Sequence, residues 1–264
     1  MVKLPSPIRF GIAPRRAAGR IGILVALTLA IVVSGLGLVE RAAARQQTSP
    51  LDDPSSFSAT IDNPMFPLSR FGYREYKGYS YDLTTGELIE TRVEETLLPE
   101  TREVARVDVA VIEVREYEDG ELVELTLDFF TQHADGTVYY MGEEVSDYED
   151  GDVTGHSGEW LAGEGENQPG VSMPARAELG QTYQQEIAPG VAEDYTTVVA
   201  LDQPIATVAG TFSGCMRTED VNPLDDSTEY KYYCPEVGFV REESGAKFLD
   251  LVRYDPVPAA TPVT

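Results

Sequence analysis

The chain has 264 residues, with 20 Lys and Arg against 45 Asp and Glu, and a formal net charge of −25. Residues 1–44 hold six bases and one acid, so residues 45–264 hold 14 bases and 44 acids, a net charge of −30. A surface this acidic repels nucleic acid and anionic lipid headgroups, which excludes nucleic acid as a partner. Two cysteines are too few to form a structural zinc site on their own.

The N-terminus carries the pattern of a membrane-targeting segment. Residues 1–20 are basic and contain no acid, and residues 21–39 form an uncharged, mostly apolar run of 19 residues. This order predicts a signal anchor or a signal peptide, with the basic segment in the cytoplasm and the rest of the chain outside it. The length of the run favours a retained transmembrane helix in the cell membrane. The small residues Ala42-Ala43-Ala44 leave an alternative open, in which cleavage near Ala44 secretes the remainder.

Composition divides the rest of the chain into three parts. Residues 45–60 are polar and contain two prolines, which predicts a flexible linker. Residues 255–264 contain three prolines and small residues, which predicts a disordered tail. Between them, residues 61–254 are predicted to be an acidic domain, of a length that a single β domain reaches.

Strand signals dominate that domain, and helical periodicity is nearly absent. Asp-Gly pairs at 119–120, 135–136 and 150–151 separate runs of β-forming residues, and Asp-Gly is a preferred pair for tight hairpin turns. The segment Glu87–Leu98 is also predicted to be a strand. The sequence therefore predicts an all-β fold, an antiparallel meander that forms a sandwich or an open curved half-barrel, preceded by one N-terminal apolar helix.

The run Val123–Phe129 shows the strand pattern most clearly. Its apolar residues alternate with Glu124, Thr126 and Asp128. A period of two places alternate side chains on opposite faces of a sheet. We expect the apolar face to pack on the core and the acidic face to lie in water.

The domain shows signs of two related halves, at about residues 61–162 and 175–254. Each half contains two long predicted strands, an aromatic pair at the end of the second, a short turn and a further strand. The aromatic pairs are Phe129-Phe130 and Tyr232-Tyr233. A generic meander would give a similar pattern, so both interpretations stay open.

A hairpin in the second half predicts a disulfide. If its turn is centred between Leu224 and Asp225, positions that sum to 449 face each other, and Cys215 and Cys234 are such a pair. Directly opposed residues on antiparallel strands lie at about 4.5–5.5 Å between Cα atoms, which a disulfide can span. We expect an intramolecular bridge in an oxidising compartment, with two buried thiols as the alternative.

Around the same hairpin stand Gly210-Thr211-Phe212 and Glu229-Tyr230-Lys231-Tyr232-Tyr233. With these residues the hairpin resembles a family of uncharacterised bacterial proteins that are exported or membrane-anchored. The resemblance covers roughly residues 61–243 and implies an extracytoplasmic β fold without an assigned activity. Strand pattern alone is also similar to curved half-barrels that carry lipoproteins or lipids in the envelope, a fold-level analogy. The residues that carry the family resemblance are Gly210-Thr211-Phe212, Cys215, Glu229-Tyr230-Lys231-Tyr232-Tyr233, Pro235 and Val237-Gly238-Phe239-Val240, together with Asn63-Pro64, Phe66-Pro67-Leu68, Gln168-Pro169-Gly170-Val171 and Met173-Pro174.

No catalytic or cofactor-binding constellation emerges from the sequence. His156 and Ser157 are adjacent, and adjacent residues on a strand point to opposite faces, so the histidine is poorly placed to serve the serine as a base. A carboxylate-dependent hydrolase needs two acids in a cleft, and 44 acids offer no way to select the pair. We expect no cofactor.

The weak metal candidates lie at one acidic turn. Asp147, Glu149, Asp150 and Asp152 surround Gly151, and Ca²⁺ prefers six to eight oxygen ligands. The spacing does not match an EF-hand loop, so a solvated hairpin turn is the preferred interpretation.

Aromatic residues give a further candidate site. Tyr73, Tyr76, Tyr79 and Tyr81 stand at the start of the domain and would line an apolar cavity if they faced inward. Tyrosine is also a favoured strand residue, so core packing is the preferred interpretation.

These observations favour a non-enzymatic extracytoplasmic envelope protein, a binding or interaction module for an unknown protein or apolar ligand, held in the membrane through residues 21–39. One alternative is a structural or adhesive surface domain that uses calcium. The other is a carboxylate-dependent hydrolase.

Overall fold

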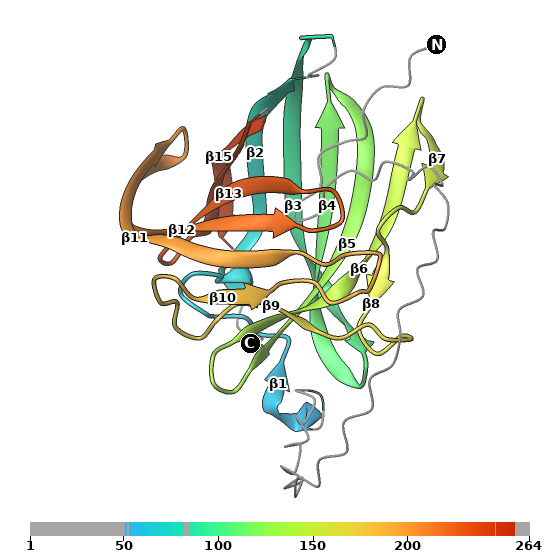
Figure 1. The fold of residues 1–264 in the computed structure, drawn as a ribbon, viewed down its shortest axis with the longest axis vertical. Coiled ribbons are helices and arrows are strands. Elements are labelled where there is room, and N and C mark those ends of the chain that lie inside the picture. Colours follow the sequence, from blue (N-terminus) through green and yellow to red (C-terminus); the bar gives the residue numbers. More distant parts are fainter. Residues whose placement is uncertain (1–50, 52, 82–84, 246, 257–264) are drawn as a thin grey trace, which may run out of the picture.

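A computed structural model describes residues 51, 53–81, 85–245 and 247–256. These residues form one antiparallel sheet of fifteen strands with two short 3-10 helices, η2 (Pro54–Ser56) and η3 (Leu68–Arg70) (Figure 1). The predicted all-β antiparallel fold is confirmed. The strands are β1 (Phe57–Ser58), β2 (Phe71–Tyr81), β3 (Leu88–Val104), β4 (Val107–Glu118), β5 (Glu121–His133), β6 (Val138–Glu149), β7 (Asp152–Gly155), β8 (Trp160–Leu161), β9 (Gly170–Met173), β10 (Thr182–Gln184), β11 (Tyr195–Thr207), β12 (Gly210–Asn222), β13 (Ser227–Cys234), β14 (Gly238–Ser244) and β15 (Lys247–Pro256).

The predicted basic segment, the apolar helix at 21–39 and the cleavage region at Ala44 lie outside the described residues. Within the described part of the chain, no helix is long and apolar enough to cross a membrane.

The sheet consists of two six-stranded meanders joined side by side. One runs β2-β3-β4-β5-β6-β7 and the other β10-β11-β12-β13-β14-β15, and the seam between them is the pairing of β15 with β2. At this seam Gly78 lies opposite Leu249, and a Cβ atom on Gly78 would come within 1.7 Å of the Phe248 carbonyl oxygen. The first meander lies within the predicted half 61–162, and the second overlaps the predicted half 175–254 but ends at Pro256.

The sheet is not closed, and it curves so that β10–β13 cross in front of β3–β6 (Figure 1). The faces that the two meanders turn toward each other share one hydrophobic cluster, in which Val198 and Met216 belong with Ile112 and Val138. A second cluster, which includes Val109, lies in the part of the sheet that pairs with β8. The shared cluster is therefore the interior that both meanders enclose.

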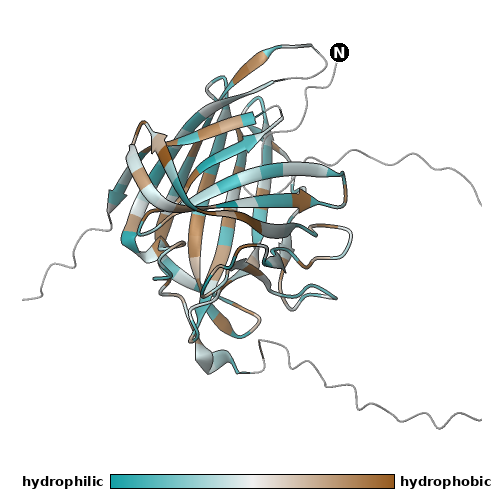
Figure 2. Cartoon of the chain, turned by 60° about the vertical axis from the view of Figure 1, so that its left-hand side comes forward, coloured by the Kyte–Doolittle hydropathy of each residue, from teal (hydrophilic) through white to brown (hydrophobic). Residues whose placement is uncertain are grey.

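The polar face of β5 points inward, which corrects the prediction for this strand. Glu124, Thr126 and Asp128 are each about 5% exposed, whereas Leu125 and Leu127 are only partly buried. Figure 2 shows hydrophilic and hydrophobic residues alternating along strands of the sheet. The period of two was correct, but the interior between the meanders is lined in part by charged side chains, so the face assignment was wrong.

The folded unit extends further in both directions than the sequence indicated. Phe57 and Ser58, which fall in the predicted linker 45–60, form β1 and pair with His133 and Gln132 of β5. At the other end β15 continues to Pro256, so the first residues of the predicted tail 255–264 belong to a strand. Backbone pairing therefore fixes these segments to the sheet.

The expected tight turns are present. Both residues of the Asp119-Gly120 and Asp150-Gly151 pairs have positive φ, as a two-residue hairpin turn requires. In the Asp135-Gly136 pair only the glycine does. The predicted strand at Glu87–Leu98 is part of the longer β3.

Candidate functional site

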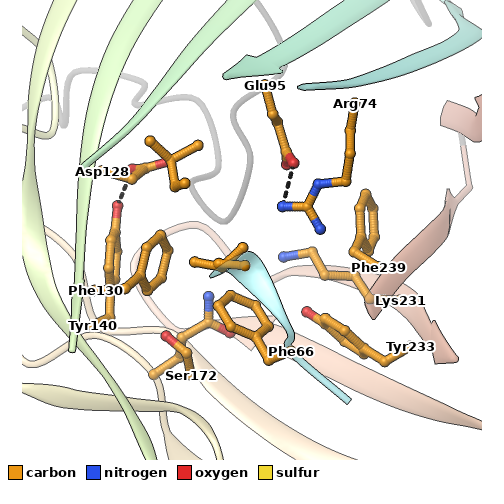
Figure 3. Close-up of a pocket in the computed structure, with 13 residues that line it drawn as sticks. Phe66, Arg74, Glu95, Asp128, Phe130, Tyr140, Ser172, Lys231, Tyr233 and Phe239 are labelled. Carbon is orange, nitrogen blue, oxygen red and sulfur yellow. Dashed lines mark hydrogen bonds and ion pairs between the residues drawn. The ribbon is translucent and has the colours of Figure 1, made fainter. Parts of the chain in front are cut away.

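A small pocket lies between the two meanders, with a volume of about 60 Å³. In Figure 3 the side chains of Asp128, Phe130 and Tyr140 face those of Lys231 and Phe239 across it. The remaining lining residues come from the segment before β2, from β2–β4, from β9, from the turn after β10 and from β13. The complete lining is Phe66, Leu68, Arg74, Glu95, Ile112, Asp128, Phe130, Tyr140, Ser172, Gln185, Lys231, Tyr233 and Phe239.

One side of the pocket is a buried ion pair. The Arg74 guanidinium on β2 lies 2.6 Å from a Glu95 carboxylate oxygen on β3, and both side chains are less than one-tenth exposed. The Tyr76 hydroxyl donates to the same carboxylate oxygen at 3.4 Å. Burial raises the pKa of Glu95, and the Arg74 charge and the Tyr76 hydrogen bond oppose that rise.

The opposite side carries a second buried carboxyl group. The Tyr140 hydroxyl donates to Asp128 Oδ1 at 2.6 Å. A register shift between Phe129 and Phe130 lets Phe130 pair with Tyr140, and their rings stack at 4.9 Å between centroids. Burial raises the pKa of Asp128 to about 7, although the Tyr140 hydrogen bond lowers it. This carboxyl group therefore exchanges its proton close to neutral pH.

Lys231 on β13 supplies the second cation of the pocket. Its ammonium nitrogen lies 2.7 Å from Glu229 and 3.2 Å from Asp220, and the lysine side chain is 4% exposed. Burial lowers the pKa of Lys231, but the two carboxylates outweigh burial and hold it well above its usual range. Lys231 therefore stays charged. The carboxylates that balance its charge, Glu229 and Asp220, are not part of the pocket lining.

The rest of the wall is largely aromatic. The Phe66 ring meets the Phe130 ring edge to face at 5.2 Å and lies 6.3 Å from Tyr233. Ser172 of β9 also lines the pocket, and its hydroxyl is buried and has no hydrogen-bond partner among the described residues. A buried hydroxyl without a partner is unusual, and it gives a ligand a free donor and acceptor.

The geometry suits a small polar occupant. Pockets for drug-sized ligands measure about 300–1,000 Å³, several times the volume of this one. The paired charges fix orientation, and the aromatic rings offer faces for an apolar or cationic group.

The predicted disulfide is confirmed. Cys215 on β12 and Cys234 on β13 are joined, with 4.1 Å between their Cα atoms, and both side chains are fully buried. The strand register also agrees, because Met216 pairs with Tyr233 and Asn222 pairs with Ser227, pairs that sum to 449.

The predicted calcium candidates lie at the turn between β6 and β7. Asp147 is occupied locally, since one of its carboxylate oxygens accepts hydrogen bonds from the Ser157 amide at 3.0 Å and hydroxyl at 2.6 Å. No three His, Cys, Asp or Glu side chains in the described part of the chain are arranged to hold a metal ion. Glu149 pairs with Asp152 across this turn, and Asp150 lies within it with a positive φ.

His156 and Ser157 are not arranged for nucleophilic catalysis. The Ser157 hydroxyl donates to Asp147, while His156 Nδ1 lies 2.5 Å from the Val145 carbonyl oxygen. Each side chain is thus engaged with a different partner.

The aromatic residues that line the pocket differ from those that the sequence suggested. Of the four early tyrosines only Tyr76 is buried, and Tyr79 and Tyr81 are more than 40% exposed. The lining rings instead come from Phe66, from β5 and β6, and from β13 and β14. The one sequence signal for these lining rings was the two aromatic pairs, Phe129-Phe130 and Tyr232-Tyr233. Phe130 of the first pair and Tyr233 of the second line the pocket.

Comparisons with known proteins give little further information. No family model matches the chain, and a search of curated proteins finds no match. A crystal structure of a "putative lipoprotein" from Parabacteroides distasonis ATCC 8503 is similar to this chain, with a TM-score of 0.40 and 14% sequence identity. The match covers 75% of this chain and 100% of the other.

Proposed function

We propose that this protein is an extracytoplasmic binding module of the cell envelope, whose interior pocket takes a small polar ligand or the tip of one polar side chain from a protein partner. The observation that carries the proposal is the pocket itself. Two buried cations, two carboxyl groups and an unpartnered serine hydroxyl converge on one space between aromatic rings. Burying polar groups is unfavourable unless they are paired, so a sequence that retains them in its interior points to recognition.

The pocket volume selects among ligand classes. A carrier of lipids or other large apolar ligands needs a cavity of several hundred Å³. A volume of about 60 Å³ accommodates a group of a few heavy atoms. The proposal therefore replaces the apolar ligand expected from the sequence with a small polar one.

Two Ser172 variants test whether the pocket binds. We would follow ethylammonium, ethanol and acetate by NMR chemical-shift changes in the full-length protein. Ser172→Leu adds apolar volume to the pocket, whereas Ser172→Ala removes only the hydroxyl. We expect at least one probe to shift pocket resonances in the wild type and Ser172→Ala, and none in Ser172→Leu. Equal shifts in all three proteins would show that the probes bind elsewhere.

The envelope location rests on the N-terminal sequence and is tested separately. Cell fractionation followed by intact-mass analysis should recover the protein with membranes, or outside the cytoplasm with its N-terminus at Arg45. An intact, freely soluble chain in the cytosol would contradict this part of the proposal.

A hydrolase is the second candidate, because Glu95 and Asp128 both line the pocket and burial raises the pKa of each. Perturbed carboxyl groups in a cleft are typical of acid–base sites. This candidate predicts turnover of small ester or glycoside substrates that Asp128→Asn abolishes. Turnover that Asp128→Asn leaves unchanged, or none at all, would remove it.

A further inference from the structure

The lining of the pocket presents hydrogen-bond donors on one side and an acceptor on the other. In Figure 3 the cationic ends of Arg74 and Lys231 lie on one side, and the Asp128 carboxyl group lies on the other. The two cations are matched by two carboxyl groups, Glu95 and Asp128, so the formal charges of the lining cancel. A ligand with a net charge would disturb this balance in a buried site, where an unpaired charge is strongly unfavourable. The lining therefore favours a neutral group that accepts at one end and donates at the other.

Both cations have N–H groups left for a ligand. The Arg74 guanidinium carries five N–H donors, and its one ion-pair partner among the described residues is Glu95, at 2.6 Å from Nη2. The Lys231 ammonium carries three donors, and Glu229 at 2.7 Å and Asp220 at 3.2 Å account for two of them. Since both side chains line the pocket, the remaining donors can meet a carbonyl oxygen there.

The acceptor side also has capacity left. Asp128 Oδ1 accepts from the Tyr140 hydroxyl at 2.6 Å. An ionised carboxylate offers about four acceptor sites, so one hydrogen bond leaves room for a ligand N–H. The pKa of Asp128 is about 7, so the group is mostly ionised at pH 8. The Ser172 hydroxyl, which has no hydrogen-bond partner among the described residues, lines the same pocket and is a further acceptor.

The strand register sets the distance that a ligand has to bridge. Asp128 pairs with Ile112 of β4, and Ile112 pairs with Leu97 of β3. Glu95 also lies on β3, so two strand spacings, about 10 Å in all, separate its strand from that of Asp128. A primary amide whose oxygen and nitrogen each make a hydrogen bond of about 2.9 Å spans about 8 Å, whereas a single hydroxyl oxygen spans about 6 Å. An amide thus reaches from the guanidinium that Glu95 holds to the Asp128 carboxylate.

The aromatic wall suits a planar group. The ring centroids follow one another at 5.2 Å from Phe130 to Phe66, 6.3 Å from Phe66 to Tyr233 and 5.8 Å from Tyr233 to Phe239. All four rings line the pocket. Flat rings pack well against a flat amide, and their faces also accept weak N–H···π contacts.

We propose that the ligand of this pocket is a primary carboxamide, with its carbonyl oxygen toward Arg74 and Lys231 and its NH₂ group toward Asp128. This inference rests on the proposed function, since it names the ligand class of the same pocket. Binding makes and breaks hydrogen bonds alone, and no covalent bond changes. A free small amide and the side chain of an asparagine or glutamine in a protein partner share this chemistry.

NMR titration of the full-length protein at pH 8 with acetamide, acetate and acetamidinium tests the inference. The three probes share one planar shape and differ in charge. Acetamide should bind about tenfold more tightly than either ion, because acetate lacks the donor and acetamidinium lacks the acceptor, and each leaves a buried polar group unpaired. Acetamide should also shift the carboxyl carbon signal of Asp128 and the guanidinium nitrogen signals of Arg74. The carboxyl signal of Glu121, an exposed residue of the same β5 strand, should not move.

Asp128→Asn is the key variant. It should weaken acetamide binding about fivefold, because a hydrogen bond to a neutral acceptor is weaker than one to a carboxylate. The same substitution should tighten acetate binding, since it removes a negative charge from the pocket. A general disturbance of the fold would weaken both probes, so opposite changes identify a direct contact. Glu121→Gln is the control and should change neither affinity. If Asp128→Asn folds poorly, the wild-type comparison of the three probes still decides.

Two peptides distinguish the sources of the amide. One is acetyl-Gly-Gln-Gly-N-methylamide, and its control is acetyl-Gly-Met-Gly-N-methylamide. Binding of the glutamine peptide as tight as that of acetamide, with no binding of the methionine peptide, would assign the group to the side chain of a partner. Acetamide binding without binding of the glutamine peptide would assign it to a free small amide.

The outcomes separate this inference from the proposed function. If ethanol, acetate or ethylammonium binds in a way that Ser172→Leu blocks, and acetamide binds no more tightly than its charged counterparts, the pocket stands and the carboxamide ligand is wrong. If acetamide binds but leaves the signals of Asp128 and Arg74 unmoved, the assigned contacts are wrong. If no probe binds, both proposals fall.

Discussion

Arg74 and Glu95 form an ion pair inside the sheet, with 2.6 Å between guanidinium nitrogen and carboxylate oxygen and less than one-tenth of either side chain exposed. The pair lies on neighbouring strands of one meander and lines the pocket toward the other. Gly238, with a φ of 84°, approaches the same guanidinium, since a Cβ there would lie 3.4 Å from Arg74 Nη1. The charges of the pocket are thus built into the packing of the domain.

Removing one partner of this pair should be strongly destabilising. Glu95→Gln leaves the Arg74 guanidinium buried without its counter-charge, and we expect the free energy of unfolding to fall by about 3 kcal/mol. Denaturant unfolding measures this loss. Glu144→Gln breaks the exposed Arg102–Glu144 pair, with both side chains 42% exposed, and should lower it by less than about 1 kcal/mol. Equal effects of the two substitutions would contradict the burial of the pair.

The domain should be more stable at mildly acidic than at alkaline pH. Burial raises the pKa of Asp128 and Glu242 to about 7 and that of Asp194 to about 8, whereas unfolded carboxyl groups titrate near about 4. The folded state therefore binds more protons between these values, and its stability falls as pH rises from about 4 through the folded pKa values. Urea unfolding midpoints should be lower at pH 9 than at pH 5.

The matched variant for this pH dependence is Asp128→Asn, which removes one titrating group and keeps its shape. Asp128→Asn should reduce the fall of the urea unfolding midpoint between pH 5 and pH 9. The remaining fall should come from Glu242 and Asp194. A midpoint that rises between pH 5 and pH 9 would show that the interior acids titrate in the ordinary range.

The disulfide should contribute a large share of the stability. Cys215 and Cys234 are separated by 19 residues, and closing a loop of this size stabilises a protein by about 3 kcal/mol in the chain-entropy model. The double variant Cys215→Ala, Cys234→Ala should lose about that amount in denaturant unfolding, and reductant should affect only the wild type. Two free thiols in the oxidised wild type would refute the bridge.

Gly78 should be essential to the seam between the meanders. A Cβ at this position would overlap the Phe248 carbonyl oxygen at 1.7 Å, so Gly78→Ala should separate β2 from β15 and cost about 1–3 kcal/mol or more. Gly245→Ala is the control, because nothing lies within 4 Å of an added Cβ there. Thermal unfolding compares them, and a normal melting temperature for Gly78→Ala would contradict the seam.

The sequence predicted local features of the fold well, because they depend on short-range chemistry. The turn near Leu224 sets the register of β12 and β13, and that register places Cys215 opposite Cys234. Positive φ at Asp119 and Asp150 follows from the Asp-Gly pairs. Each of these features is fixed within one hairpin.

The face assignment of β5 could not be predicted in the same way. Alternation of Leu125 and Leu127 with Glu124 and Asp128 defines two faces but does not say which one the rest of the sheet covers. That depends on how the second meander crosses the first. Because the enclosed interior is charged, the usual assignment of acids to water was wrong here.

The pocket was missed for a related reason. Its residues come from positions as distant as Phe66 and Phe239, and no spacing within one segment brings them together. Ser172 gave no signal at all, since the lack of a hydrogen-bond partner for its hydroxyl among the described residues exists only in three dimensions.

Carbon-13 NMR of the carboxyl groups, followed against pH in the full-length protein, tests most directly whether the interior between the meanders buries acids. The account predicts that Asp128 titrates near 7 and Asp194 near 8. Midpoints near about 4, the range of carboxyl groups in water, would contradict it.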